Sequence, residues 1–408
     1  MKSLSSLVLI AVVVACHGEE LPTGGASVVD SAGVVIVTNS IAESAISTWS
    51  IEPNPIVRVG GEREEPNQQL YWVVGAIRLS DGRLAVANAG TVEILYYDRA
   101  GECVRAVGGR GGGPGEFEWL DWIARLAGDS IAAYDSSQRR VSWFDDEGEF
   151  VRSITVRASP NVTWPSPVGV FDDGSVLVRQ SISPEEYSGL HHWEFRLLRY
   201  DTSTDSMTPL GRFPGQDTYI LRVGRGVANY GVPFGRATAV GLADTLFYVA
   251  HNDRFDVRFY EPSGTLRRIV RRVQPLVPVT DELADRFRGA ALELVPSERR
   301  SRVASVQAEV PVRETVPAFG SAYYVRQVPG AKDVMLDEAG NLWVLEYTWH
   351  RNEATHWSIL GGDGVAVAQL TLPAGYEPLH IGRDHLVLLT RDELDVESVQ
   401  VHRILKGS

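Results

Sequence analysis

The chain has 408 residues, of which 44% are hydrophobic and 9% aromatic, and this composition excludes an intrinsically disordered protein. Its formal net charge of -13 at pH 7 argues against a nucleic-acid-binding protein and leaves no basic stripe for anionic lipid. The 2 cysteines, Cys16 and Cys103, are too few for a disulfide framework or a thiolate metal cluster.

The first sixteen residues have the pattern of a secretory signal. Lys2 precedes an apolar run over residues 7–14, which is too short to span a bilayer as a mature helix. The run ends in "VVAC", residues 13–16, which resembles the bacterial lipobox. In a lipobox, cleavage occurs before the cysteine, and the cysteine thiol carries diacylglycerol.

We therefore predict a signal peptide over residues 1–15, lipidation at Cys16 and a tether over residues 16–27. The alternative is an ordinary signal peptide with a chance cysteine. The lipobox resemblance implies a cell-envelope protein held on a membrane through Cys16. His17, and not Asp, follows the cysteine, which by the enterobacterial sorting rules favours the outer membrane.

A four-strand pattern then begins. Residues 76–108 contain short apolar segments at 77–79, 83–88, 92–97 and 102–107, separated by turns with Asp and Gly. Residues 123–156 repeat this pattern, with Asp145 standing 47 residues after its counterpart Asp98. That offset is close to the period of a β-propeller blade.

Weaker copies of the pattern follow at residues 168–213, 237–272, 333–372 and 378–405. Together the copies predict an all-β fold, a six-bladed β-propeller of four-stranded antiparallel blades over residues 28–408. We expect the N-terminal strands, around residues 28–37 and 46–59, to pair with the last blade. Such closure removes the exposed sheet edges that invite aggregation.

One segment, residues 273–324, departs from the β pattern between the fourth and fifth units. Its apolar side chains recur at helical spacing, at Leu283, Phe287, Ala291 and Leu294. Thr280 and Ser297 are the predicted N-caps of two helices. A long insertion of this kind is more often functional than filler.

The stretch "GGRGGGPGEF", residues 108–117, is not a phosphate-binding loop. It lacks the Gly-Lys-Ser/Thr ending and no helix signal follows it. It is explained as the crossover between the first two blades, where glycine allows the required backbone angles. We expect Phe117 to wedge between the two sheets.

Together with "LAGDSIAAYDSSQRRVSWFDDEGEF", residues 126–150, this stretch resembles bacterial six-bladed β-propeller proteins of the NHL- or TolB-like kind. Such proteins recur as predicted lipoproteins. The resemblance runs from about Val57 to the C-terminus and is strongest in the first two blades. It is informative for the fold and poor for the function, because propellers include binding scaffolds and unrelated enzymes.

Blade geometry predicts two different faces. The tight first-to-second and third-to-fourth turns share one face, named here the turn face. The second-to-third loops and the crossovers share the other, the long-loop face, where a ligand site is expected. The candidate ligand-binding residues on that face are Trp119, Tyr230, His251, Tyr347 and Trp349.

Aromatic side chains at a channel mouth suit a carbohydrate, a peptide or a protein partner. The alternative is that these tryptophans only wedge blades together and that the loop histidines are exposed surface residues.

A metal site is a second candidate. Gluconolactonase-type propellers hold calcium on the axis with Asn, Asp and Glu oxygens at comparable strand ends, so the resemblance implies Asn88, Asp135 and Glu346 as ligands. The equivalent positions in the other units do not fit, being Gln180, Ala250 and Thr390. The alternative is that Asn and Asp simply begin turns there.

The sequence therefore favours a lipid-anchored binding module of the cell envelope that recognises its ligand through the long-loop face. The alternative is a divalent-cation-dependent hydrolase or lyase of the gluconolactonase type, with Ca²⁺ as the candidate cofactor. Whether the chain is an enzyme is left open, and so is the identity of the ligand.

Overall fold

The computed structural model describes residues 25–40, 46–61, 69–157, 165–182, 188–223, 226–293, 295–321, 333–348 and 353–407. Cys16 and Trp349 lie outside these residues, so the lipidation site and one ligand candidate remain sequence-based predictions.

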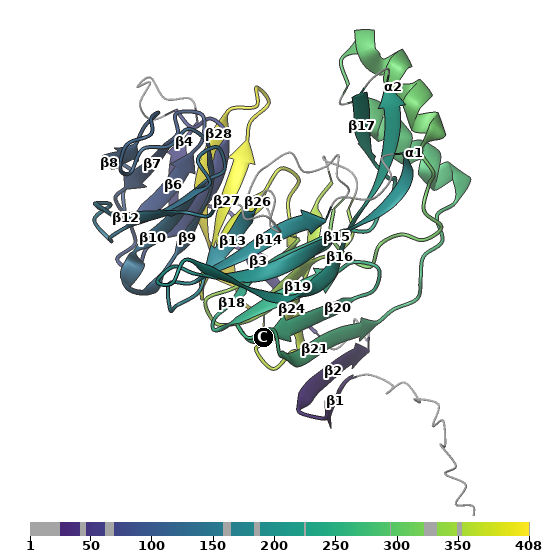
Figure 1. Cartoon of the computed structure of the whole chain (residues 1–408), viewed down its shortest axis with the longest axis horizontal. Coiled ribbons are helices and arrows are strands. Elements are labelled where there is room, and N and C mark those ends of the chain that lie inside the picture. The colour runs from purple at the N-terminus through teal and green to yellow at the C-terminus, as the bar shows by residue number, and fades with distance from the viewer. Residues whose placement is uncertain are drawn as a thin grey trace, which may run out of the picture.

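Antiparallel four-stranded blades follow one another along the chain (Figure 1). Blade 1 consists of β5 (Val73–Arg78), β6 (Leu84–Asn88), β7 (Glu93–Tyr97) and β8 (Cys103–Gly108). Blade 2 consists of β9 (Leu120–Arg125), β10 (Ile131–Asp135), β11 (Arg140–Phe144) and β12 (Phe150–Thr155). Blade 3 consists of β13 (Ser166–Val170), β14 (Val176–Ile182), β15 (Gly189–Asp201) and β16 (Ser206–Val223), and β17 (Gly226–Gly231) pairs with β16 as a fifth strand.

The second half of the ring is built in the same way. Blade 4 consists of β18 (Thr238–Ala243), β19 (Leu246–His251), β20 (Asp256–Tyr260) and β21 (Leu266–Val273). Blade 5 consists of β22 (Val334–Leu336), β23 (Leu342–Leu345), β24 (Thr355–Leu360) and β25 (Ala366–Leu372). Blade 6 consists of β26 (Glu377–Ile381), β27 (His385–Arg391), β28 (Glu397–Leu405) and the N-terminal strand β4 (Val57–Gly60).

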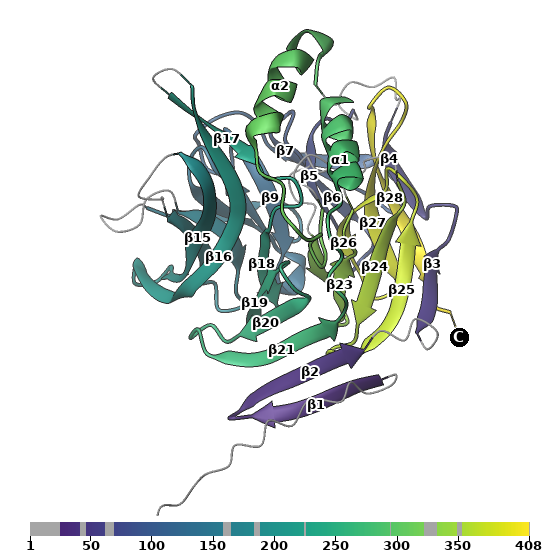
Figure 2. The same cartoon turned by 90° about the vertical axis from the view of Figure 1, so that its right-hand side faces the viewer.

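The expected pairing of the N-terminal strands with the last blade is correct for β4 and wrong for the first two strands. β1 (Gly25–Ser31) and β2 (Val34–Ser40) form a hairpin whose second strand runs parallel to β21, on the outer edge of blade 4 (Figure 2). β3 (Ser47–Ile51) bridges β25 and the end of β28. β1 and β2 do not join blade 6 because its fourth strand position is already occupied by β4.

The core is divided among the blade interfaces, with one apolar cluster between each pair of neighbouring blades. Between blades 1 and 2, fully buried Phe117 packs against Phe144 with ring centroids 6.0 Å apart. The glycine-rich stretch is therefore the crossover from β8 to β9, with Phe117 as the wedge. Because the side chains of a strand alternate between its two faces, each central strand serves two interfaces and is buried on both.

The helical insertion follows β21 and precedes β22. It consists of α1 (Asp281–Glu293) and α2 (Ser297–Glu309). The Thr280 hydroxyl accepts a hydrogen bond from the Leu283 amide and caps α1, as predicted. Ser297 is not a cap, because α2 begins at Ser297 and the preceding Pro296 holds the cap position. Phe287 of α1 packs on Phe234 with ring centroids 4.7 Å apart, which holds the insertion over the long-loop face.

Candidate functional site

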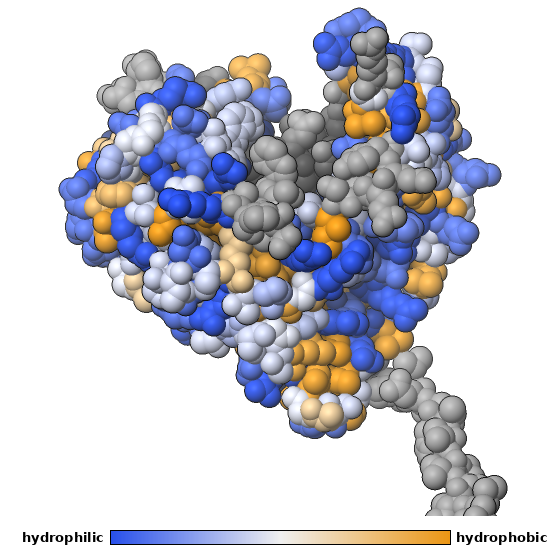
Figure 3. Space-filling model, viewed as in Figure 1, coloured by the Kyte–Doolittle hydropathy of each residue, from blue (hydrophilic) through white to orange (hydrophobic). Residues whose placement is uncertain are grey.

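The longest strands of the described chain lie in blade 3 and lead onto the long-loop face. β15 has 13 residues and β16 has 18, and with β17 they extend beyond the blade toward the helices. β17 lies near α1 and α2 in both cartoon views (Figures 1 and 2). In the space-filling view the part of the molecule that carries the helices rises above the neighbouring surface (Figure 3).

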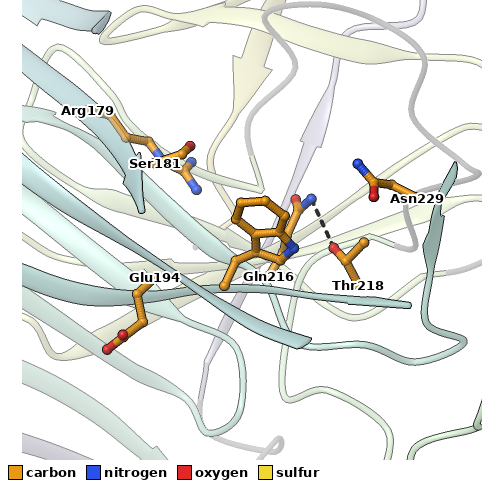
Figure 4. A pocket seen from close by; sticks show the side chains of 7 residues that line it. Arg179, Ser181, Glu194, Gln216, Thr218 and Asn229 are labelled. Carbon is orange, nitrogen blue, oxygen red and sulfur yellow. Dashed lines mark hydrogen bonds between the residues drawn. The ribbon is translucent and has the colours of Figure 1, made fainter. Parts of the chain in front are cut away.

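A pocket of about 290 Å³ is formed where this extension leaves the blade (Figure 4). Four strands of blade 3 supply its lining, which consists of Arg179, Ser181, Trp193, Glu194, Gln216, Thr218 and Asn229. The lining is mainly polar, and it belongs to the face where a ligand site is expected. It contains none of the predicted ligand residues.

Arg179 is the most unusual member of this lining. It follows directly on the apolar run of strand β14, where its neighbour Val178 is fully buried. Its guanidinium lies over the Phe195 ring, 4.1 Å from the ring centroid. No carboxylate among the described residues compensates this charge, and burial lowers the pKa of Arg179. A half-buried cation beside a pocket, with no carboxylate to balance it among the described residues, is suited to an anionic ligand.

Further hydrogen-bonding groups surround the guanidinium. The indole Nε1 of Trp193 is buried and has no partner within the described part of the chain. The Gln216 amide donates to the Thr218 hydroxyl at 3.4 Å, and Asn229 is exposed on the neighbouring strand. An orphaned buried donor of this kind calls for an explanation, and a bound acceptor is a common one.

The acidic residue of the pocket is already paired. Glu194 forms an ion pair with Arg212 of β16. Its side chain points away from Gln216, Thr218 and Asn229 (Figure 4). The electrostatic character of the pocket is therefore set by Arg179.

Next to the pocket, Asp217 holds two basic side chains together. Its carboxylate lies 2.5 Å from Nδ1 of His192 and accepts a hydrogen bond from Nε of Arg236 at 3.0 Å. Burial would raise the pKa of Asp217, but the hydrogen bonds from Arg236 and His192 outweigh it, and the pKa is lowered. The ionised carboxylate of Asp217 therefore connects Arg236, in the crossover before blade 4, to the extended strands β15 and β16 of blade 3.

His251 ends β19 on the same face. The Thr238 hydroxyl donates to the Pro214 carbonyl at 2.6 Å, so it accepts from Nδ1 of His251 at 2.8 Å. This assignment places the proton of the neutral imidazole on Nδ1 and the lone pair on Nε2. Burial is the main cause that lowers the pKa of His251, which keeps the ring neutral at physiological pH.

The other predicted ligand residues are spread around the ring. Trp119 precedes β9 and is 46% exposed, with its ring edge-to-face against Trp72 at 4.9 Å. Tyr230 lies in β17, opposite Tyr219. Tyr347 packs on Phe234 beneath the helical insertion, and burial raises its pKa.

Each of the three predicted metal ligands has protein partners. Oδ1 of Asn88 accepts from the Tyr71 amide at 2.9 Å, and the carboxylate of Asp135 accepts from the Glu118 amide at 2.6 Å. Each of these two hydrogen bonds connects the end of the second strand of a blade, β6 or β10, to the segment that leads into that blade. Glu346, in blade 5, accepts two hydrogen bonds from Arg272, at 2.6 and 2.7 Å.

The described residues include no group of three or more His, Cys, Asp or Glu side chains that could hold a metal ion. The calcium site therefore stays a sequence-based prediction. The structure explains these three side chains through their hydrogen bonds, in line with the alternative that Asn and Asp begin turns.

Known proteins share the architecture. Residues 66–170 match the model of the DUF5128 family, described as 6-bladed beta-propeller. A member of the duf4221 family from Bacteroides vulgatus has a TM-score of 0.53 at 9% identity, over 88% of this chain and 99% of that chain. The family model and this likeness agree with the strand topology: the chain is a six-bladed β-propeller.

Two enzymes are more distant structural neighbours. A gluconolactonase from Xanthomonas campestris has a TM-score of 0.43 at 10% identity, covering 88% of this chain and 97% of that chain. Virginiamycin B lyase from Staphylococcus aureus has a TM-score of 0.40 at 9% identity, covering 88% of this chain and 100% of that chain. No curated protein matches the sequence.

No helix within the described ranges is long and apolar enough to cross a membrane. Sequence reasoning missed Arg179, although a signal was available: in "VLVRQS" a basic residue stands within a strand, directly after an apolar run.

Proposed function

We propose that the protein is a binding module whose long-loop face recognises an acidic carbohydrate in the blade 3 pocket. The observation that carries this proposal is the guanidinium of Arg179, which faces the pocket without a carboxylate partner among the described residues. A carboxylate on the ligand would supply the missing charge, and guanidinium matches carboxylate geometry well.

The rest of the lining favours a sugar over an apolar molecule. Ser181, Gln216, Thr218 and Asn229 offer hydroxyl and amide groups, which donate and accept hydrogen bonds as sugar hydroxyls require. Trp193 adds an indole, whose apolar body and polar N–H suit a sugar ring. A pocket for an apolar ligand would be lined mainly by hydrophobic side chains.

Binding of uronic-acid oligosaccharides and of matched neutral oligosaccharides, measured by calorimetry, tests the proposal. The acidic series should bind and the neutral series should bind much more weakly. Arg179→Gln should weaken acidic binding by about 10-fold or more, since a hydrogen bond to a charged group contributes roughly 1.5–3 kcal/mol. Glu194→Gln, which removes a negative charge from the same lining, should leave acidic binding unchanged or tighten it.

Two outcomes would overturn the proposal. One is equal binding of acidic and neutral sugars, and the other is acidic binding that survives Arg179→Gln. If peptides with a free carboxylate bind through Arg179 while uronic acids do not, the anion preference stands and the carbohydrate assignment is wrong.

We further propose that lipidation at Cys16 holds this module at the cell envelope, on the outer membrane. The support is the sequence "VVAC" after an apolar run of signal-peptide length. A Cys16→Ser chain should lose acyl labelling and leave the membrane fraction, while sugar binding is retained. A Cys16→Ser chain that stays in the membrane fraction would contradict the anchor.

A further inference from the structure

A second cavity lies at the opposite mouth of the propeller, on the turn face. Its volume is about 690 Å³, and blades 1, 2, 5 and 6 all contribute to it. The charged and titratable residues in its lining are Arg78, Asp81, Arg99, Arg125, Glu338, Arg383, Asp384 and His385. Apart from Arg99, which lies in the turn between β7 and β8, they come from the ends of first strands, the turns that follow them and the start of β27, so they lie around the axis of the ring.

One side of this cavity is fixed by a network of ion pairs. Arg125 of blade 2 pairs with Glu338 of blade 5 and with Asp129, whose carboxylate accepts from the Ser80 amide at 2.9 Å. The network joins three blades around the axis. Arg125 therefore has two carboxylate partners, and its charge is already balanced.

Polar atoms at this mouth are buried without a partner in the described part of the structure. They are Nε of Arg78 and Nε2 of His385, and Nδ1 of the neighbouring His380. His385 is only 7% exposed and lines the cavity directly. Each orphaned buried polar group costs about 1–3 kcal/mol, so a bound ligand that pairs several of them around one cavity would be stabilised.

The charges of the lining leave a positive excess. Asp81 pairs with Arg83 and Glu338 with Arg125, and the four arginines of the lining outnumber its three carboxylates. By contrast, Arg78, Arg99 and Arg383 form no ion pair with a carboxylate of the described chain; Nε of Arg99 bonds only to the Asp81 backbone carbonyl. The cavity therefore attracts an anion.

His385 presents its second ring nitrogen to that anion. Its Nδ1 lies 2.9 Å from the Asp384 carboxylate, which can only accept, so Nδ1 carries the proton. The hydrogen bond from His385 is the main cause of the lowered pKa of Asp384, with Arg78 contributing through its charge. If the ring is neutral, Nε2 is then an acceptor that a hydroxyl on the ligand can pair.

We propose that the turn-face cavity binds inorganic phosphate, with Arg78 and Arg383 holding its oxygens and Nε2 of a neutral His385 accepting from its hydroxyl. Inorganic phosphate near neutral pH carries both negative charge and a hydroxyl, whereas a phosphate monoester above its second pKa of about 6 has lost its hydroxyl. Sulfate has the same shape and charge but no hydroxyl. Comparing the affinities for sulfate and for phosphate therefore distinguishes recognition of charge from the hydrogen bond to His385.

Calorimetric titration of the folded protein with inorganic phosphate, glycerol 3-phosphate and sulfate is the test. At about pH 7.5 inorganic phosphate should bind, and sulfate and glycerol 3-phosphate, which lack the hydroxyl, should each bind at least tenfold more weakly. Glycerol 3-phosphate that binds as tightly as inorganic phosphate would show that charge alone is recognised. Arg78→Gln and Arg383→Gln should each weaken phosphate binding at least tenfold, and Arg105→Gln, at an exposed ion pair with Glu149, is the matched control.

Phosphate affinity that is the same in wild type, Arg78→Gln and Arg383→Gln would overturn the proposal, and so would the absence of phosphate binding at millimolar concentrations. Equal affinity for sulfate and phosphate would show that His385 does not accept from the ligand. Arg179→Gln should leave phosphate binding unchanged, so this site and the blade 3 pocket are tested independently.

Discussion

Arg125 and Glu338 form an ion pair that crosses the axis of the propeller, because they belong to blades 2 and 5, which stand opposite each other in a ring of six. Both side chains are about three-quarters buried, at 26% and 28% exposure. His380 of blade 6 lies beside the pair, with Nε2 3.5 Å from the Glu338 carboxylate. Blades that share no sheet are thus connected directly at the turn face.

This pair predicts a measurable coupling between opposite blades. Glu338→Gln should cost about 1 kcal/mol of unfolding free energy, since Arg125 keeps Asp129 and partly exposed pairs contribute little. Arg125→Met should cost about 2–3 kcal/mol because two carboxylates then lose a charged donor. In urea unfolding, the double variant should cost less than the sum of the two single ones. Strict additivity would mean that the two side chains do not interact in solution.

The pH dependence of stability should reflect His380. Burial, with smaller contributions from His385 and Arg125, lowers the pKa of His380 to about 3. The folded chain then keeps this ring neutral while the unfolded chain protonates it below about 6.5. The stability that His380 contributes is therefore complete above pH 6.5 and is lost as the pH falls from 6.5 toward 3, by up to about 1.4 kcal/mol per pH unit.

The comparison of wild type with His380→Phe checks this prediction. The unfolding free energy of the variant should fall less steeply between pH 6.5 and 5, a range in which most carboxylates remain ionised. Exposed His356, which bonds to the Thr371 hydroxyl, provides a control through His356→Gln, whose slope should match wild type. Parallel slopes for wild type and His380→Phe would contradict the assignment.

Asp135 should be structural and independent of calcium. It is fully buried and accepts from the amides of Glu118 and Gln138 at 2.6 and 2.8 Å. Asp135→Asn replaces one acceptor with a donor facing an amide, so it should cost about 1–3 kcal/mol. Exposed Asp172 supplies the control, since Asp172→Asn should change stability by less than about 0.5 kcal/mol.

Calcium and chelator distinguish this role from metal binding. The melting temperature of wild type should be the same with calcium and with chelator. A rise with calcium that disappears in Asp135→Asn would restore the sequence-based prediction of a metal site.

The regular blades were predictable from the sequence because their turns and strands have local signals. Asp98 and Asp145 accept backbone hydrogen bonds inside their own turns, at 2.8–2.9 Å, so the repeat can be recognised without tertiary information. The position of β1 and β2 was not predictable in this way. It depends on which edge is free after β4 has completed blade 6, and Asn39 then bonds to the carbonyls of Arg271 and Gly364, more than 200 residues away.

The sequence predicted the face on which the blade 3 pocket lies, but not the pocket itself. The aromatic loop residues were visible in the sequence, but the pocket is created by the unusual length of β15 and β16 in the irregular third unit. Arg179 and Trp193 meet there across strand pairings that no short segment specifies. The turn-face cavity is assembled from four blades, so only the closed ring brings Arg78 and His385 together.

The glycine-rich crossover offers a matched pair of substitutions within one loop. Gly108 has a φ of +104°, and a Cβ there would lie 2.9 Å from the Phe117 ring and 3.0 Å from the Val92 carbonyl oxygen. Gly112 meets nothing within 4 Å and has no positive φ. Gly108→Ala should therefore cost about 1–3 kcal/mol from the strained backbone, with a further loss if Phe117 is displaced. Gly112→Ala should be neutral or slightly stabilising, because alanine reduces the freedom of the unfolded chain. Urea unfolding of both variants decides the point: equal stabilities would mean that the close packing of Phe117 on Gly108 is absent in solution.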